Sequence, residues 1–565
     1  MPGLTISNRP IPGELLKVLP GYVSREHIAQ DDLFICSSGY KAYPIREWQT
    51  GDWHILLEGH IYDLSDEAIV EQLNALVERG IDNHEWHKWI SARDGDFIIL
   101  AIHAESGQFM IVNDRFGRLP FYLYVKDSDF IFSREISLIL DFGKPSPDPL
   151  LTACYLSFGY VCGDRTLYKE VRKMAPFSVL HYRKDSGLTE VNYFCSKEMF
   201  IGESIANSGV LKDKLSFALQ RRIMKCGPAG LALSGGLDSR LLAALLEESG
   251  TRIPAFTYTR DPQQNDVDLI SANEIAEHLQ MGLRHTIIDL SQSCDGLEEL
   301  WTIKRGQNFL AMGYIIPFLK LYGEKELTQI TGDGGDKTLE NTYPLRTLNS
   351  EDDLLRYIFK KHRVLSSSSV EKITGVAEHE LRSYVLSTLE KDPELSFDQK
   401  YAVFILKERA MNWLFEGEDR NRYYAWTCTP FYAPDAFMVT FRIDPKQKEH
   451  GKLFSDLLSQ LPGETQHILN PNWGLPPVPH EPVRKLFRRQ HWKTRIPDFL
   501  LRSLSKKSKM SWKDFTVGNQ LHDPVANGQF PEWLNCNKIT EGTRFTQNEH
   551  WTFYTVLRML SRGKE

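Results

Sequence analysis

Strands and helices alternate along the middle of this chain, and this alternation restricts the fold more than any other feature. Short apolar runs predict strands at Gly230–Leu233, Ile253–Thr259, His285–Leu290 and Leu327–Ile330. Helical patterns lie between them, at Ser239–Glu248 and Val267–Leu279. Such alternation is typical of a parallel sheet with helices on both faces. In that architecture, ligands bind at the carboxyl ends of the strands.

The first 195 residues follow a shorter rhythm that predicts antiparallel strands. Apolar or alternating runs separated by turn residues lie at Phe97–Ala101, Phe109–Val112, Phe121–Val125 and Phe130–Phe132. A helical stripe at Asp66–Arg79 interrupts this meander. Since 565 residues exceed what one core usually supports, we expect two domains, 1–195 and 205–565. The fold class is then a two-domain combination: an antiparallel β-sandwich with helices, followed by a Rossmann-like α/β domain with a helical extension.

The last part of the chain gives weaker signals. Ser366–Ser369 is predicted to be a surface turn, and Pro471–Pro482 an extended loop. From Arg484 to Lys513 there are eleven Lys or Arg residues and one acid, Asp498. This basic stretch is interpreted either as a solvated helical face or as a surface for an acidic partner, such as a carrier protein or a leader peptide.

Composition excludes several classes of protein. A net charge of −7 argues against a nucleic-acid binder held by bulk attraction. No apolar run approaches the roughly 18 residues that span a bilayer, and the N-terminus does not resemble a secretory signal. Eight scattered cysteines without a CxxC pair favour a reducing compartment. We therefore expect a cytoplasmic protein with neither a membrane nor a nucleic-acid partner.

The strongest local motif is Ser234-Gly235-Gly236-Leu237-Asp238-Ser239, between a predicted strand and a predicted helix. Glycines let the backbone approach an anion closely, and the amides of the helix start point at it. The hydroxyls of Ser234 and Ser239 add donors. Asp238 would repel a phosphate unless a cation lies between them, and Mg²⁺ prefers this combination of oxygens.

A second turn, Thr331-Gly332-Asp333-Gly334-Gly335-Asp336, follows the strand predicted at Leu327–Ile330. Its acids are expected at the same edge of the sheet, where Asp336 would face Asp238 across a metal. A calcium-type loop is the rival interpretation, but its remaining ligand positions are missing.

These motifs together resemble the asparagine synthetase family. The loop at Ser234 is similar to the pyrophosphate-binding (PP) loop of that family, and the turn at Gly332 to its SGEGxDE motif. Earlier segments resemble the class II glutamine amidotransferase domain of the same family: Glu58-Gly59-His60-Ile61-Tyr62-Asp63 (NGEIYN), Asn113 to Tyr122 (RDxxGxxPLYY) and Phe132-Ser133-Arg134-Glu135 (FASE). The resemblance covers roughly residues 30–470, and it implies an Ntn-hydrolase-like sandwich followed by a PP-loop domain.

The resemblance also implies site residues and a reaction. ATP and Mg²⁺ are the implied cofactors, with Asp238 and Asp336 on the metal and Asp333 and Lys337 as candidate catalytic residues. The implied nucleotide-binding residues are Leu233, Ser234, Gly235, Gly236, Asp238, Ser239, Tyr258 and Gly332. The implied reaction is activation of a carboxylate as an acyl-adenylate, after which an amine displaces AMP. The substrate would be a small-molecule or peptide carboxylate, and a homodimer is one open possibility for the assembly.

Departures from the family pattern bear on the nitrogen source. The cysteine nucleophile of the amidotransferase is absent, since Pro2 follows Met1, and Glu58 replaces an asparagine that binds glutamine. The family lysine after an LP pair is also missing beyond Leu461-Pro462. We therefore predict an ATP-dependent amide ligase that uses ammonia or a substrate amine. The alternatives are a glutamine-hydrolysing asparagine synthase and a non-catalytic nucleotide-binding scaffold.

Overall fold

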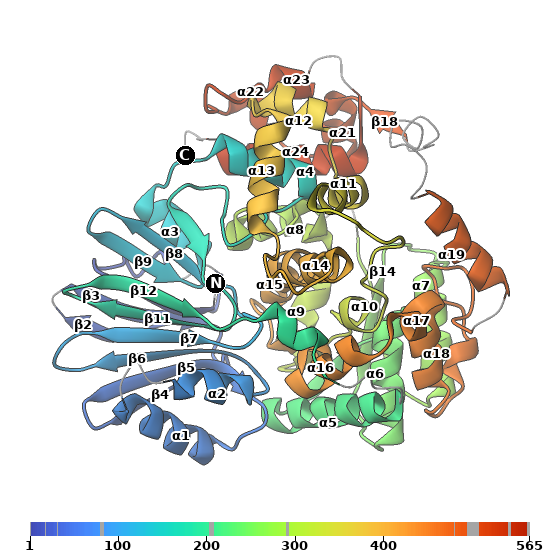
Figure 1. The fold of residues 1–565 in the computed structure, drawn as a ribbon, viewed down its shortest axis with the longest axis horizontal. Coiled ribbons are helices and arrows are strands. Elements are labelled where there is room, and N and C mark those ends of the chain that lie inside the picture. Colours follow the sequence, from blue (N-terminus) through green and yellow to red (C-terminus); the bar gives the residue numbers. More distant parts are fainter. Residues whose placement is uncertain are drawn as a thin grey trace.

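Two antiparallel sheets lie face to face in the N-terminal third of the chain (Figure 1). The computed structural model describes residues 2–16, 19–30, 32–79, 84–202, 208–289, 293–478, 481–493, 508–540 and 544–561. One sheet has the order β10-β8-β9-β1-β3-β2 and the other β12-β11-β7-β6-β5-β4. Inward-facing side chains of both sheets, such as Ile6, Ile35, Ile98 and Leu180, belong to one buried core. The predicted antiparallel sandwich is therefore confirmed.

The strands of the sandwich are short, and helices cover its outer faces. The strands of the first sheet are β1 (Gly3–Ser7), β2 (Val23–Gln30), β3 (Leu33–Gly39), β8 (Tyr122–Lys126), β9 (Asp129–Ser133) and β10 (Val171–Lys173). Those of the second are β4 (Ile45–Thr50), β5 (Trp53–Ile61), β6 (Gly95–His103), β7 (Phe109–Asn113), β11 (Ser178–Arg183) and β12 (Gly187–Asn192). The outer helices are α1 (Asp66–Glu78), α2 (Glu85–Ser91), α3 (Ile136–Gly143) and α4 (Pro149–Phe158).

Helix α1 confirms the helical stripe predicted at Asp66–Arg79. Its buried residues are those of the stripe, namely Ile69, Leu73, Leu76 and Val77. They pack on the second sheet, because they share a core with strand residues such as Ile55 and Val112. Apolar residues at intervals of three to four positions thus form the face of α1 that packs on the sheet.

The second domain contains a parallel sheet of five strands in the order β15-β14-β13-β16-β17. Its strands are β13 (Ala229–Ala232), β14 (Ala255–Thr259), β15 (Leu283–Ile287), β16 (Thr328–Ile330) and β17 (Thr427–Cys428). All four pairings are parallel, as the alternation predicted. The surrounding helices and connections are α5 (Ser208–Cys226), α6 (Leu237–Glu248), α7 (Val267–His278), α8 (Ser293–Lys304), α9 (Ile316–Glu324) and α10 (Gly335–Thr338).

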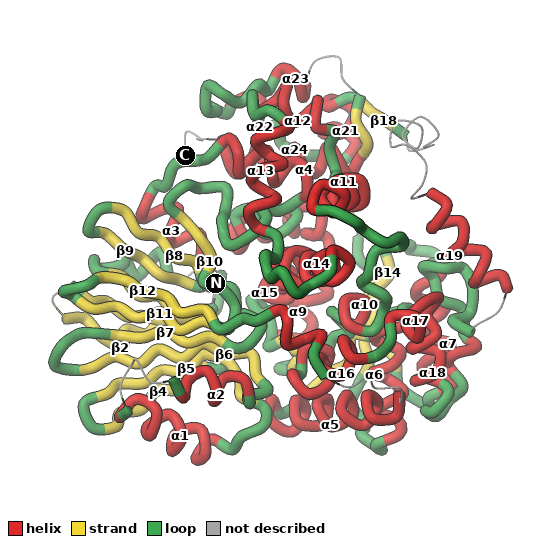
Figure 2. Tube along the Cα trace, in the orientation of Figure 1, coloured by secondary structure: helices red, strands yellow, loops and turns green. Residues whose placement is uncertain are grey.

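The rest of the chain is mainly helical (Figure 2). Its helices are α11 (Glu351–His362), α12 (Ser367–Thr374), α13 (Glu378–Thr388), α14 (Phe397–Phe404), the π-helix η4 (Ile405–Leu414), α15 (Phe415–Asn421), α16 (Pro434–Arg442), α17 (Pro445–Lys448), α18 (Lys452–Leu458), α19 (Glu481–Lys493), α21 (Trp512–Gly518), α22 (Pro524–Asn527), α23 (Asn537–Thr540) and α24 (Gln547–Leu560). A short ribbon pairs β18 (Lys509–Met510) with β19 (Phe545–Thr546). No helix within the described ranges is long and apolar enough to cross a membrane.

Two local predictions in this region are wrong. Ser366–Ser369 is not a surface turn but the start of α12, because the Ser366 hydroxyl accepts a hydrogen bond from the Ser369 amide (3.2 Å) and caps the helix. The loop predicted to reach Pro482 ends earlier, since α19 begins at Glu481. Proline is tolerated in the first turn of a helix, because an amide proton at that position would have no acceptor within the helix.

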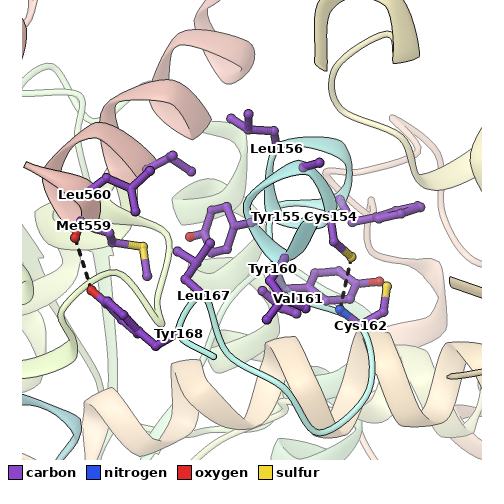
Figure 3. Packing of buried hydrophobic residues seen from close by; sticks show 14 of the residues in the cluster. Cys154, Tyr155, Leu156, Tyr160, Val161, Cys162, Leu167, Tyr168, Met559 and Leu560 are labelled. Carbon is purple, nitrogen blue, oxygen red and sulfur yellow. Dashed lines mark hydrogen bonds between the residues drawn. The ribbon is translucent and has the colours of Figure 1, made fainter. Parts of the chain in front are cut away.

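Helix α4 connects the N-terminal part of the chain to the C-terminal helices. Figure 3 shows its buried residues beside Met559 and Leu560 of α24, with the Tyr168 hydroxyl donating to the Met559 carbonyl at 3.1 Å. Helices α12 and α13 also pack on α4. One buried core therefore includes residues from both ends of the chain, and the division near residue 195 stays a prediction.

Candidate active site

The candidate site lies where the strand order reverses. Strand β13 is central, β14 and β15 lie to one side of it, and β16 and β17 lie to the other. The connections that leave β13 and β16 therefore diverge, and they open a crevice at the carboxyl ends of these two neighbouring strands. The loop at Ser234 follows β13, and the turn at Gly332 follows β16. The topology places the two predicted anion-binding motifs next to each other.

Glycines let the two motifs touch. A Cβ atom at Gly335 would lie 2.4 Å from Oδ1 of Asp238, and one at Gly332 would lie 2.6 Å from the Ser239 amide nitrogen. Neither distance is compatible with a side chain. Both positions thus need glycine because the second turn packs directly on the start of α6.

Every predicted site residue except Gly235 lines one cavity of about 500 Å³. This volume lies within the range of small-molecule sites. Gly235 is buried behind the cavity wall, and its amide donates to the Asp268 carboxylate at 3.1 Å. Tyr258, at the end of β14, forms part of the wall, and its hydroxyl lies 3.5 Å from that of Tyr314.

The loop after β13 presents donors to the cavity. The hydroxyls of Ser234 and Ser239 lie 3.0 Å apart, and the Ser239 hydroxyl also accepts from the Ser234 amide at 3.0 Å. Gly236 precedes α6, which has no side-chain cap at its N-terminus. Uncapped amides at the positive end of a helix favour an anion.

Carboxylates from both turns lie close together in the cavity. Burial, reinforced by the charges of Asp336 and Glu340, raises the pKa of Asp238 well above its ordinary value. Burial and Asp336 likewise raise the pKa of Glu340 to about 7. Like charges held this close require a proton or a cation between them.

This donor set suits Mg²⁺. Mg²⁺ binds through one or two carboxylates together with phosphate oxygens and water. Asp238 and Asp336 supply two carboxylates at the loop Ser234–Ser239, which we call the phosphate-type loop. The Asp336 side chain is 45% exposed and forms an ion pair with Lys337. No cluster of three or more His, Cys, Asp or Glu side chains arranged for a metal occurs in the part of the chain that the structure describes.

Asp333 has a cationic neighbour that the sequence motifs did not reveal. Burial raises the pKa of Asp333, and the Thr331 hydroxyl and the charge of Arg420 act against this rise. Arg420, on α15, is only 5% exposed, lines the cavity and donates to Asn308 at 3.2 Å. The signal that could have found it is the charged run Glu416–Arg422, which is unusual for a buried helix.

Arg240, which follows Ser239 in the sequence, has a structural role. Its guanidinium donates to the backbone carbonyls of Gly235, Thr465, Ile468 and Leu469 at 2.7–2.9 Å. These contacts tie the phosphate-type loop to the segment that precedes Asn470. Arg240 therefore stabilises the loop from behind instead of facing the cavity.

In the N-terminal domain, two departures from the family motifs contact each other. Glu58 is fully buried and accepts from Nε of Arg134 at 2.9 Å, from the Tyr43 hydroxyl at 2.6 Å and from the Leu4 amide at 2.9 Å. Arg134 stands where the FASE motif has serine. Pro2 is buried, and the adjacent Gly3 lies against this pair, since a Cβ on Gly3 would lie 2.6 Å from both Cγ of Arg134 and Oε1 of Glu58. An ion pair therefore fills the space beside the chain start.

This ion pair continues into the second domain. Arg134 also pairs with Asp419 of α15, which accepts from Lys304 of α8 at 2.8 Å. Glu416 accepts from Lys304 at 2.6 Å and, from the other domain, Lys173 at 2.8 Å. Burial alone would raise the pKa of Asp419, but the charges of Arg134 and Lys304 lower it to about 2. A buried charge network thus joins the two domains.

The basic stretch is described only in part. Residues 484–493 lie on α19, where Arg488 is 69% exposed. Lys509 lies in β18, and Lys513 in α21. Residues 494–507 lie outside the described residues, so the partner expected at this stretch stays a prediction.

Fold and site together define a class of protein: an amidotransferase-type sandwich joined to a synthetase-type nucleotide domain. The family model described as "Asparagine synthase" matches residues 210–395, and the "Glutamine amidotransferase domain" model matches residues 50–194. The chain belongs to the asparagine synthetase family. The resemblance carried by the sequence motifs is confirmed.

Individual relatives are distant. An asparagine synthetase of Gallus gallus is 21% identical over 62% of this chain and 67% of its own length. Homologues of that type from Methanocaldococcus jannaschii and Dictyostelium discoideum are 24% and 25% identical, and the matches span only 42% and 43% of their lengths. Among solved structures, the NAD⁺ synthetase of Burkholderia pseudomallei matches 44% of this chain and 91% of its own, with 12% identity and a TM-score of 0.19.

Proposed function

We propose that this protein is an ATP-dependent ligase that activates a carboxylate as an acyl-adenylate and converts it to an amide. The observation that carries the proposal is the convergence of two acid-bearing turns in one cavity at the switch point of a parallel sheet. The serine-glycine loop suits a leaving pyrophosphate, and the paired acids suit Mg²⁺. Mg²⁺ bound by Asp238 and Asp336 would neutralise the charge of the triphosphate.

In the first step, a carboxylate oxygen of the substrate attacks the α-phosphorus of ATP. The bond from this phosphorus to the bridging oxygen breaks, and pyrophosphate leaves. The hydroxyls of Ser234 and Ser239 and the first amides of α6 bind the departing phosphates and stabilise the charge that develops on them. Leu233, Tyr258 and Gly332 surround the adenosine, since they line the same cavity.

In the second step, an amine attacks the acyl carbon, AMP leaves and the amine gives up a proton. Asp333 accepts this proton, because burial raises its pKa above the ordinary value of a carboxyl and so makes it a stronger base. Arg420 stabilises the negative charge on the acyl oxygen, in the role for which the family lysine is missing. Lys337 holds Asp336 in position through their ion pair.

The nitrogen comes from ammonia or from a substrate amine. Glutamine hydrolysis is disfavoured because Pro2 supplies no thiol and the Glu58–Arg134 ion pair fills the place where glutamine would bind. A glutaminase assay on the pure protein tests this point, and release of glutamate would contradict it.

A non-catalytic nucleotide-binding role is the second candidate. It is favoured because two cations near the site are already engaged: Lys337 pairs with Asp336, and Arg240 donates to backbone carbonyls. Calorimetry with ATP and Mg²⁺, followed by an ATP–pyrophosphate exchange screen over carboxylic acids, separates the candidates. Exchange that needs one particular acid supports the ligase. Nucleotide binding without exchange for any acid supports the non-catalytic role, and no binding at millimolar nucleotide rejects both.

A further inference from the structure

A second cavity, of about 470 Å³, adjoins the nucleotide cavity and is lined by basic residues. Lys361, Arg363, Arg409 and Lys509 contribute to its wall, against one acid, Glu549. Burial, together with the charges of Arg409 and Lys361, lowers the pKa of His362 in the same wall to about 3, so this imidazole is neutral at physiological pH. The cavity therefore carries a clear excess of positive charge.

The two cavities share a wall. Phe309 and Trp413 line both of them. Lys337, on the acid-bearing turn of the nucleotide cavity, is close enough to His362 to lower its pKa. A molecule that reaches from one cavity to the other would therefore pass these two aromatic side chains.

The shared wall is built on the π-helix η4 (Ile405–Leu414). Such helices are rare and are frequent at functional sites, because the wider turn redirects side chains. Arg409 and Trp413 of η4 face the basic cavity, and Trp413 and Leu414 face the nucleotide cavity. One distorted helix thus places a cation and an aromatic ring between the two spaces.

Glu549, the acid in the same wall, contributes to a helix cap. The Glu549 carboxylate accepts from the amide and the hydroxyl of Thr546, both at 2.8 Å, as part of the cap of α24. Within the described residues, no carboxylate lies at ion-pair distance from Arg409, whose guanidinium is instead held 4.7 Å from the ring centroid of Trp413. A guanidinium held by an aromatic ring keeps donors available for an anion.

We propose that the basic cavity binds a second anionic group of the substrate whose carboxylate is activated at the nucleotide cavity. The substrate would then be a small polyanionic acid with a carboxylate or phosphate remote from the reacting carboxylate. This inference rests on the proposed function, and it narrows the substrate class from any carboxylic acid to acids that carry a further negative charge.

Calorimetry on the full chain tests the inference. The protein is first saturated with Mg²⁺ and α,β-methylene-ATP, which occupies the phosphate-type loop, and is then titrated with tricarballylate or with glycerol 3-phosphate. Wild type is expected to bind at least one of the two, and the preferred one identifies the remote group as carboxylate or phosphate. Lys361→Gln and Arg409→Gln should each weaken this binding about tenfold or more, as expected for loss of a charged hydrogen bond.

Lys372→Gln is the matched control, because Lys372 is an exposed lysine on neighbouring α12 that lines neither cavity. It should bind the anion as wild type does. Unchanged nucleotide affinity in each variant reports an intact fold, and Lys361→Gln carries the test if Arg409→Gln fails to fold, since Lys361 is exposed.

Two results would overturn the inference: nucleotide-loaded wild type binds neither anion, or both cavity variants bind as tightly as the control. Failure of the proposed function is seen separately, as no binding of the nucleotide analogue in the first titration. In that case, anion binding by the nucleotide-free protein does not support the inference, because no substrate would be activated at the nucleotide cavity.

Discussion

Replacing Asp238 by asparagine should stabilise the empty protein and abolish its response to magnesium nucleotide. Asp238 lies beside Asp336 and Glu340, and burial and these like charges raise its pKa. The asparagine side chain has nearly the same size as that of aspartate but carries no charge. The substitution therefore separates the electrostatic cost of the acid cluster from its packing.

The magnitude follows from the pKa of Glu340, which burial and Asp336 raise to about 7. Relative to an ordinary value of about 4.3, this pKa corresponds to about 4 kcal/mol of destabilisation once the carboxyl is ionised. The folded state binds more protons than the unfolded state between these two pKa values, so stability falls as pH rises through this window. Removing one charge of the cluster should return about 1–3 kcal/mol at pH 7.5 and above.

The assay is thermal unfolding at pH 5 and pH 8, with and without Mg²⁺ and α,β-methylene-ATP. Asp238→Asn should raise the unfolding midpoint of the ligand-free protein at pH 8 more than at pH 5. Wild type should gain about 2.7 kcal/mol from ligand at one hundred times its Kd, and the variant should lose most of this gain. Asp213→Asn, at an exposed position on α5, is the control and should change neither quantity.

The reasoning is refuted if Asp238→Asn leaves the ligand-free midpoint at pH 8 unchanged and keeps the magnesium-dependent gain. The acids would then neither repel each other nor hold the metal.

Three further predictions follow from buried charges. Arg134→Met should destabilise the protein by about 3–5 kcal/mol, because it removes a partner from buried carboxylates. The control Arg9→Met removes an exposed ion pair and should cost about 1 kcal/mol or less. Both free energies are measured by urea unfolding, and equal effects would contradict this prediction. Burial lowers the pKa of Lys448, which donates to the Thr338 carbonyl at 2.9 Å, to about 7. Between about pH 7 and pH 10 the unfolded state therefore binds more protons than the folded state, so the free energy of unfolding rises with pH across this window. Lys448→Met should remove this rise when the free energy of unfolding is measured at pH 7, 8.5 and 10. Finally, Pro2→Cys should produce no glutaminase activity in a glutamate-release assay, because the buried ion pair still fills the site; restored hydrolysis would show that only the thiol was missing.

Much of the fold could be predicted because local periodicity reflects burial. The stripe of α1 and the alternation around β13, β14 and β16 needed no knowledge of long-range contacts. Both acid-bearing turns could be located because glycine and acid spacing is a local property. Their position at one edge followed from the rule that parallel strands end at the same side of a sheet, and the contact between them comes from the pairing of β13 with β16.

The remaining features depend on contacts that sequence patterns do not encode. Ser366 gave a turn signal, and whether a serine turns the chain or caps a helix is decided by the residues that pack afterwards. The π-helix at Ile405–Leu414 has ordinary helical composition, so no sequence signal marks it. The charged run around Arg420 marks this residue as unusual but does not assign it to the cavity, because Arg420 lies 84 positions beyond Asp336 in the sequence.

The buried charges that connect the sandwich to α15 give the sandwich a structural role that does not depend on a reaction of its own. Arg134 and Lys173 of the sandwich, together with Lys304, are counter-ions of Asp419 and Glu416, and these acids share α15 with Arg420. Removing the sandwich would take away two of these three cations, so the helix that carries Arg420 depends on the sandwich for its charge balance.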